Sequence, residues 1–479
     1  MTTAILVLGI GLALASAIVM LRPEWRLPAF AFILLALPGN VDDLLPQMRL
    51  DPHELVNGTA AAVSVVDLLL LWAVILTVRD GRRLRIPAWL FAVAGILTAL
   101  AVLAAAVAVA RGVEPLAGVR GAIVFVRILA VLFLAGSLVE SRRDAVRIGL
   151  AITAGGAALI GNGLYTSTSQ DLDRFTATTF GRNTFAIALI ICAIVAAGVV
   201  FSLWDRRRAS GRETLIVVAS AFIAAACLFA AVATGTRMSL VALVGAGVLV
   251  LILSTSWRSM EGLRRVGVVA AVTIAIIASA GVLTPGGARA LSVVTAAEEV
   301  ARGVTDRESL PIYSEIRSRG DFWALAIRMA VENPSFGVGP FQWNIQRYDF
   351  AEYEPLVADP HNSYLQVAAE YGIPPVAFYV LLIAACLLLV VLASWRPTAL
   401  SRTDWLVASL AGAALVVPIA DMTNSNLFNA RMGPVAWLLL AVAVTYAALS
   451  ARESRSLRAR ESRAPARADP PGREADHPV

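Results

Sequence analysis

Apolar segments long enough to cross a membrane alternate with short polar connections along most of the chain. A helix needs roughly 20 apolar residues to cross about 30 Å of hydrocarbon. Such segments begin near thirteen positions: Thr3, Leu27, Thr59, Pro87, Val119, Arg147, Asn183, Thr214, Arg237, Val266, Gly372, Asp404 and Met432. The second is continuously apolar only from Leu27 to Leu37, which predicts a kinked or partly re-entrant segment. The pattern predicts an all-α, polytopic transmembrane helical bundle of about 12–13 spans.

Arginine placement gives an independent test of this topology, because short cytoplasmic connections are rich in basic residues and external ones are poor. Every basic residue of the chain is an arginine, and arginines mark every second connection, at 22–26, 79–85, 142–147, 206–212, 258–265 and 396–402, and again the tail after Ser450. The first segment has no basic residue before it, which favours a retained span over a signal peptide. We therefore predict an external amino terminus and an internal tail.

One external connection is much longer than the others and divides the chain. We predict transmembrane helices 1 to 10 at 1–284, a long periplasmic loop with the candidate catalytic motif and short helices at 285–371, the C-terminal transmembrane helices at 372–450, and an Arg-rich cytoplasmic tail at 451–479. The tail has almost no large apolar residues, so we expect it to be disordered. The composition, 58% hydrophobic and 15% charged, is typical of a membrane protein and not of a soluble enzyme.

The long loop carries an amphipathic helix followed by a glycine-rich turn. The segment from Arg319 to Glu332 has an apolar stripe of Phe322, Trp323, Ala326, Ile327 and Ala330, and we expect the helix to lie across the outer surface of the bundle. Asn333-Pro334 ends the helix. Gly337 and Gly339 follow in a turn where glycine permits positive φ angles and close backbone approach.

A second short helix is predicted to run from Asp359 to about Gly372. Asp359 is placed to cap it, Pro360 suits its first turn and Gly372 suits its exit, so His361 is expected in the first turn. The only other histidines, His53 and His477, are most simply polar surface residues. The cap, the defined helix and the neighbouring glycine turn distinguish His361, and a neutral imidazole there can act as a general base.

Two arginines open spans at their outer ends, on the same side as His361. Arg182 follows Gly181, and Arg237 follows Gly235-Thr236. A charge within the membrane costs about 2.5–3.5 kcal/mol on insertion scales and is kept for a partner or a ligand. Snorkelling to the interface is the alternative for any arginine at a helix end. The shared side of the membrane favours a common anionic ligand, since guanidinium groups bind phosphates bidentately.

Two further arginines lie deeper in the fifth apolar segment. Arg120 and Arg127 are seven residues apart and therefore share one helix face. Asp67 lies at a depth similar to that of Arg127 in the third segment. We predict a buried ion pair between Asp67 and Arg127, whereas Arg120 could serve the structure or a ligand.

Several elements of the long loop together resemble the signature loop of the O-antigen ligase and O-antigen polymerase superfamily. These elements are Arg319 with Trp323, Asn333-Pro334, Gly337-Val338-Gly339, His361-Asn362 and Glu370-Tyr371-Gly372. Arg182 and Arg237, each in a short glycine-containing element, look like the phosphate-gripping positions of that family. The resemblance implies a helical membrane bundle with a periplasmic loop layer in the bacterial inner membrane, although members often have twelve spans.

The resemblance also implies a metal-independent, inverting transfer of a glycan from undecaprenyl diphosphate to an acceptor hydroxyl, without a cofactor. His361 would take the proton of the hydroxyl, and Arg182, Arg237 and Arg319 would bind the diphosphate, with Arg319 also a candidate for the acceptor side. Further candidate substrate contacts are Arg120, Asn362, Tyr364, Gly337 and Gly339. The expected partners are the donor, a glycan, lipid or cell-wall acceptor, and membrane lipid, with no nucleic acid.

Three alternatives remain open at this point. A polymerase would use the same chemistry with a second lipid-linked glycan as acceptor; we favour a ligase. A metal-dependent transferase with a polyprenyl monophosphate donor would bind its ion through acidic residues such as Asp42-Asp43 in the first external loop. A lipid-oligosaccharide flippase would also have many spans, but its site should lie near the midplane, whereas the candidate residues lie on one side.

Overall fold

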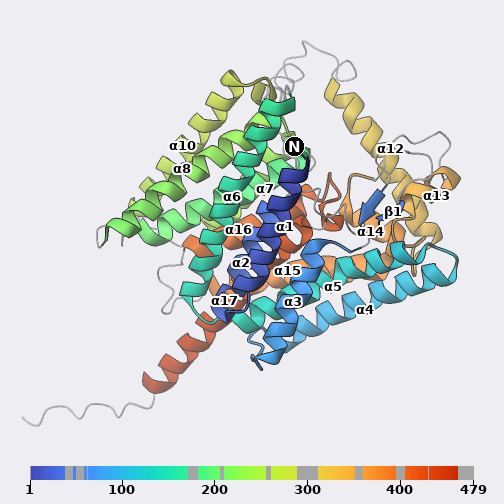
Figure 1. Cartoon of the computed structure of the whole chain (residues 1–479), viewed down its shortest axis with the longest axis horizontal. Helices are drawn as coiled ribbons and strands as arrows, with labels where there is room; N and C mark the ends of the chain where they lie inside the picture. Colours follow the sequence, from blue (N-terminus) through green and yellow to red (C-terminus); the bar gives the residue numbers. More distant parts are fainter. Residues whose placement is uncertain are drawn as a thin grey trace, which may run out of the picture.

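All thirteen predicted apolar segments contain an α-helix in the computed structural model, which describes residues 2–37, 47–49, 59–61, 63–170, 182–204, 210–254, 260–288, 311–350, 360–394, 405–429 and 431–461. The helices are α1 (Thr2–Val19), α2 (Arg26–Ala36), α3 (Val65–Arg79), α4 (Ala88–Ala110), α5 (Pro115–Leu138), α6 (Arg142–Gln170), α7 (Arg182–Leu203), α8 (Gly211–Ala233), α9 (Arg237–Leu253), α10 (Met260–Leu283), α15 (Ile373–Ser394), α16 (Trp405–Ala420) and α17 (Met432–Glu461). The protein is a polytopic helical membrane protein (Figure 1).

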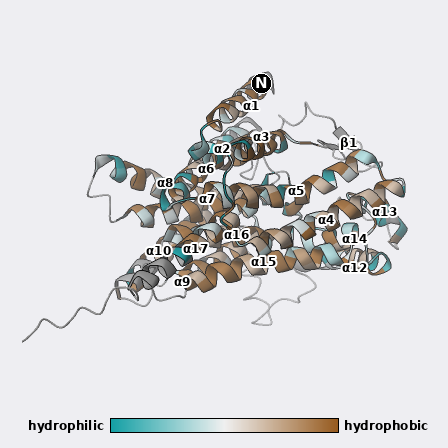
Figure 2. Cartoon of the chain, turned by 90° about the horizontal axis from the view of Figure 1, so that it is seen from below, coloured by the Kyte–Doolittle hydropathy of each residue, from teal (hydrophilic) through white to brown (hydrophobic). Residues whose placement is uncertain are grey.

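The helices differ in how well they match the thickness of a membrane. Seven of the described helices, α4 to α8, α15 and α17, are long and apolar enough to cross one, and α1, α9, α10 and α16 contain shorter apolar stretches. Hydrophobic colour covers most of α4, α5 and α15 in Figure 2. Helix α2 has 11 residues and is about 16 Å long, so it is too short to cross alone, in line with the short apolar run that defines it.

The third apolar segment begins differently from the prediction. We expected a span from about Thr59, but Thr59–Ala61 is strand β2, which pairs antiparallel with β1 (Gln47–Arg49). Helix α3 begins after Ser64 because Ser64 and Asp67 form a capping box. The Ser64 Oγ accepts from the Asp67 N–H at 3.2 Å, and the Asp67 Oδ2 accepts from the Ser64 N–H at 2.7 Å.

Helices α7, α16 and α17 form the centre of the bundle. In the most apolar window of each span, 78% of α7 and 83% of α17 is buried inside the protein, against 33% of α15 and 39% of α4 and α8. Helix α16 packs against α7, α9 and α17. The apolar faces of the outer helices α4, α8 and α15 are therefore available to lipid.

Connections predicted on the inner side bind one another. The buried Arg26 of α2 donates from Nη2 to the Asp80 Oδ2 after α3, at 2.6 Å. Arg82 and Arg85, before α4, each donate to the Glu140 Oε1 after α5, at 2.7 Å. These three connections therefore share one end of the bundle, as the arginine pattern predicted; which side of the cell they face stays a prediction.

A small layer of helices lies at one end of the bundle, and the last turns of α17 project from another side (Figure 1). The layer comprises α12 (Pro311–Glu332), α13 (Trp343–Phe350) and α14 (Ser363–Tyr371). Its own apolar core is formed by Phe322, Leu325, Ala326, Met329, Val338, Trp343 and Ala369. Helix α12 contacts α14 and α13 through this core, so α14 lies between α12 and the transmembrane helix α15 that follows it.

The predicted stripe of α12 is only partly right. Phe322, Ala326 and Ala330 are buried and Trp323 is half-buried, but Ile327 is 50% exposed. The helical period places Leu325 and Met329, rather than Ile327, on the face of Phe322 and Ala326, and both are buried. The prediction included Ile327 because this residue is hydrophobic, but its angular position on the helix places it away from the buried face.

Candidate functional site

His361 lies immediately before α14, in a backbone conformation that residues other than glycine rarely adopt. Its φ is 50°. The N-cap of α14 is Asn362, whose Oδ1 accepts from the Leu365 N–H at 3.0 Å. The predicted cap Asp359 lies outside the described residues, and the expectation that His361 sits in the first helical turn is wrong, because Asn362 is a better-placed side-chain cap. His361 therefore projects from the turn that leads into the helix.

A turn after α16 holds the start of α14. We call residues 421–428 the Asn-rich loop; it includes the 3-10 helix η6 (Asn426–Phe428). The Ser363 N–H donates to the Asp421 carbonyl at 2.8 Å, and the Ser363 Oγ donates to the Asn424 carbonyl at 3.2 Å. The Asn362 Nδ2 donates to the Met422 carbonyl at 3.1 Å. The Asn-rich loop thus holds the Ser363 backbone and the Asn362 side chain, directly after the turn that carries His361.

Arg319 reaches the same loop from α12. Its Nη1 lies 3.5 Å from the Thr423 carbonyl oxygen, and the residue is partly buried. Arg319 and Asn362, the neighbour of His361, therefore contact adjacent residues of the Asn-rich loop, Thr423 and Met422.

Arg182 and Arg237 are the first residues of α7 and α9, and their neighbours join both helices to the Asn-rich loop. The Thr236 Oγ1 donates to the Asn183 Oδ1 at 3.3 Å, and the Asn183 Nδ2 donates to the Asn424 Oδ1 at 3.1 Å. We call the joined residues the outer network: Asn183, Thr236, Asn362, Ser363 and Asn424. Its links bring together the amino-terminal ends of α7, α9 and α14.

The four principal candidates of the sequence therefore meet at one end of the bundle. Arg182 adjoins Asn183, Arg237 adjoins Thr236, and His361 adjoins Asn362 in the outer network, while Arg319 contacts the same loop. The positive end of a helix dipole and its unbonded N–H groups favour anions. The ends of α7 and α9, which both begin with an arginine, make this region suited to a multiply charged anion.

The glycine turn lies at the other end of α14. The Val338 N–H donates to the Ala369 carbonyl and the Gly339 N–H to the Glu370 carbonyl, both at 2.9 Å. Gly337 and Gly339 have φ angles of 64° and 112°, as the sequence indicated, and a Cβ on Gly337 would lie 2.3 Å from the Glu370 backbone carbon. Because α14 has nine residues, about 13.5 Å, this turn caps the helix far from His361.

Arg120 is also apart from the outer network. The Arg127 Nε and Nη2 donate to the Asp67 Oδ1 and Oδ2 at 2.5 and 2.7 Å, which confirms the predicted ion pair, and the Arg120 Nη1 lies 3.4 Å from Oδ2. We call Asp67, Arg120 and Arg127 the charged cluster; both arginines are buried. A Cβ on Gly121 would lie 2.6 Å from the Tyr371 hydroxyl oxygen, so the cluster borders the carboxyl end of α14.

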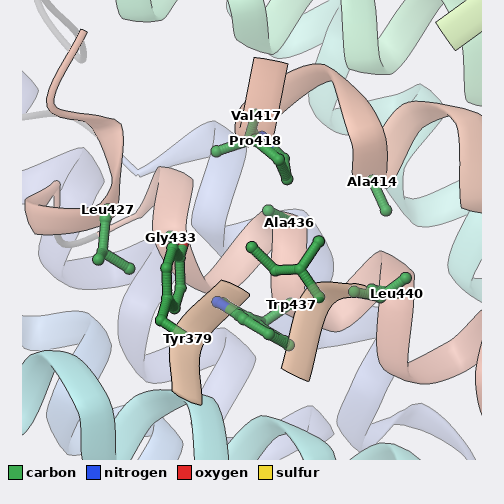
Figure 3. A pocket seen from close by; sticks show the side chains of 10 residues that line it. Tyr379, Ala414, Val417, Pro418, Leu427, Gly433, Ala436, Trp437 and Leu440 are labelled. Carbon is green, nitrogen blue, oxygen red and sulfur yellow. The ribbon is translucent and has the colours of Figure 1, made fainter. Parts of the chain in front are cut away.

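Tyr364 connects the site to an apolar pocket between α15, α16 and α17. Its hydroxyl donates to the Pro418 carbonyl at 2.9 Å, and its ring centroid lies 5.8 Å from that of Tyr379. Tyr379, Pro418, Gly433 and Trp437 are among the lining residues (Figure 3). The first turn of α14 therefore adjoins an apolar space of the membrane bundle.

A comparison with known families supports the resemblance. Residues 222–380, from α8 to the start of α15, match the family model of the O-antigen ligase. This match, over part of the chain, supports the O-antigen ligase and polymerase superfamily. No curated protein matches the chain.

The matched region supports an O-antigen ligase/polymerase-like membrane glycosyltransferase, a family that implies lipid-linked glycan substrates. The matched region contains Arg237, Arg319 and His361. Arg182 and the Asn-rich loop lie outside it and join the site through tertiary contacts. Asp42 and Asp43, on which the metal-dependent alternative depends, lie outside the described residues.

Asp421 of this ligase-like protein was not identified from the sequence. It is fully buried in the turn after α16, and its Oδ1 accepts from the Asn426 N–H at 3.1 Å. Burial raises the pKa of its carboxyl group to about 7, and hydrogen bonds from Ser363 and Asn426 limit the rise. The only local signal was the polar run Asp421 to Asn426 between two apolar helices.

Proposed function

We propose that the protein transfers a glycan from undecaprenyl diphosphate to an acceptor hydroxyl at the periplasmic face of the bacterial inner membrane, as a ligase. The transfer inverts the anomeric centre and needs no metal. The observation that carries the proposal is the outer network, which joins the starts of α7, α9 and α14 beside Arg182, Arg237 and His361. The reaction needs a base that takes the proton of the acceptor and positive groups that stabilise the departing diphosphate. In this proposal His361 is the base, and the two arginines are the positive groups.

Arg182 and Arg237 bind the diphosphate in this proposal. Charge-assisted hydrogen bonds from guanidinium groups to phosphate oxygens are strong, and helix amino-terminal ends add N–H donors. As the bond between the anomeric carbon and the diphosphate oxygen breaks, its electron pair passes to the diphosphate. Preorganised positive groups stabilise this developing charge without reorganisation, usually the largest contribution to catalysis.

His361 acts as the general base. The acceptor oxygen attacks the anomeric carbon from the face opposite the diphosphate, and its proton passes to the imidazole. The φ of 50° supports this role, because strained backbone persists where the surrounding structure enforces it and is concentrated at active sites. Arg319, whose Nη1 lies 3.5 Å from the Thr423 carbonyl oxygen, is assigned to the acceptor or the diphosphate in this proposal.

The remaining candidate contacts have supporting roles in this proposal. The Asn362 amide already binds both Met422 and Leu365, and the Tyr364 hydroxyl binds Pro418, so both hold the turn of His361. Gly337 and Gly339 cap the opposite end of α14.

Reconstitution of the full-length protein with a radiolabelled undecaprenyl-diphosphate glycan and candidate acceptors tests the proposal. We expect transfer to persist in a chelator and to fall by about 10²–10⁴-fold in His361→Ala, the usual contribution of a general base. His477→Ala, in the tail, serves as the control. Elongation of the lipid-linked glycan itself would identify a polymerase.

Two results would contradict the proposal. Transfer that depends on a divalent metal would favour a polyprenyl-monophosphate transferase. Lipid flipping without transfer, unaffected in His361→Ala, would favour a flippase.

A further inference from the structure

Asn183 bridges two elements with the two ends of one amide group. Its Oδ1 accepts from the Thr236 Oγ1 at 3.3 Å, and its Nδ2 donates to the Asn424 Oδ1 at 3.1 Å. An amide offers a donor and an acceptor in a fixed plane, which hydroxyl or apolar side chains cannot reproduce. Asn183 therefore ties the first turn of α7 to the start of α9 and to the Asn-rich loop at the same time.

The bridge reaches α9 through Thr236 and α14 through Asn424. Thr236 is the N-cap of α9, but its side chain makes no capping bond and donates to Asn183 instead. On the other side, Asn424 accepts through its carbonyl from both the N–H and the Oγ of Ser363, the first residue of α14. A continuous chain of hydrogen bonds thus runs from α9 through α7 to the start of α14.

We propose that Asn183 is a positioning residue that sets the separation of Arg182 and Arg237 and aligns both with His361. The inference rests on the proposed function, because it assigns the two arginines to one diphosphate. Asn183 need not touch the substrate. Without the Asn183 amide, α9 can shift relative to α7, so the two guanidinium groups no longer match the spacing of two linked phosphates. A misplacement of about 1 Å is enough to weaken catalysis strongly.

The test measures binding of undecaprenyl diphosphate to the full-length protein in detergent, together with KM and kcat for transfer. Asn183→Leu, close in volume, is expected to weaken binding about tenfold and to raise KM for the donor by a similar factor. KM for the acceptor and the pH profile of kcat should stay unchanged, because the His361 turn keeps its own bonds to the Asn-rich loop. A general loss of structure would change all four quantities.

A double-mutant cycle tests whether Asn183 acts through Asn424. If both act through their shared bond, Asn183→Leu with Asn424→Leu should bind the diphosphate no more than about twofold worse than the weaker single variant. Fully additive losses would overturn the proposal. Thr236→Val removes the hydrogen bond on the other side of Asn183, and it replaces Asn183→Leu in the test if that variant does not fold. We expect Thr236→Val to weaken binding of undecaprenyl diphosphate about threefold.

Asn162→Leu is the matched control. Asn162 is also half-buried, lies on the transmembrane helix α6 and accepts from Thr166 of its own helix at 3.3 Å. We expect wild-type binding in this variant. Equal binding by wild type and Asn183→Leu would overturn the inference alone, whereas a wild-type protein that binds no undecaprenyl diphosphate would overturn the proposed function.

Discussion

The charged cluster and the outer network are both polar regions of a largely apolar bundle, but the first is held by ion pairs and the second by hydrogen bonds between neutral groups. In the charged cluster the Asp67 carboxylate accepts from two side-chain nitrogens of Arg127 and lies 3.4 Å from Arg120. In the outer network amides, hydroxyls and carbonyls join the elements, so its links carry no charge that would oppose an anion. The charged cluster joins helices α3 and α5, whereas the outer network lies beside the arginines to which the proposed function assigns the diphosphate.

Breaking the charged cluster is expected to produce the largest effect, and on stability rather than on activity. Asp67→Ala leaves two buried arginines without their carboxylate, which should cost about 3–5 kcal/mol of unfolding free energy. Replacement of Asp67 and Arg127 together by leucine should recover the part of this loss that comes from Arg127, and the folded protein should retain transfer. Thermal unfolding and transfer measured on the same samples check this prediction; loss of transfer in a stable double variant would assign the cluster to catalysis.

Removing an arginine beside the outer network should lower activity and leave stability almost unchanged. We expect Arg237→Gln to lower kcat by about 10²–10³-fold, the usual effect of losing one preorganised group that stabilises developing charge. The melting temperature should hardly change. Arg212→Gln, at the exposed opposite end of α8, provides the control. An Arg237→Gln variant that transfers normally but unfolds early would place Arg237 with the structural arginines.

Asp421 is expected to make the stability of the protein depend on pH, which neither of the other variants tests. Because burial raises the folded-state pKa of its carboxyl group from 3.8 to about 7, its contribution to stability is present below pH 4 and is lost as the pH rises to about 7. Asp421→Asn should remove this dependence while its Oδ1 still accepts from Asn426. Unfolding midpoints of both proteins between pH 4 and 8 should therefore diverge; parallel curves would contradict the buried, neutral carboxyl group.

Local sequence was sufficient for the predictions that depend on helical period and on the cost of burying charge. The thirteen apolar segments follow from segment length, and the Asp67–Arg127 pair follows from two charges at equal depth that need each other. The glycine turn and the exit of α14 at Gly372 were also predictable, because positive φ angles require glycine there. Apart from the Asp67–Arg127 pair, whose residues are 60 positions apart, each of these signals lies within a few residues of the feature it predicts.

The assembly of the candidate site was decided by tertiary structure alone. Asn183 and Asn424 are 241 residues apart, and an asparagine near a helix end has many equally good local partners, so the sequence carries no signal for this bond. Asn362, and not Asp359, is the cap of α14, and its side-chain amide also donates to the Met422 carbonyl of the Asn-rich loop. The sequence by itself determined which helices form and which groups must be paired. Only the packing of α7, α9 and α16 decided which helix starts meet, since a hydrogen bond between distant segments exists only after their helices have packed.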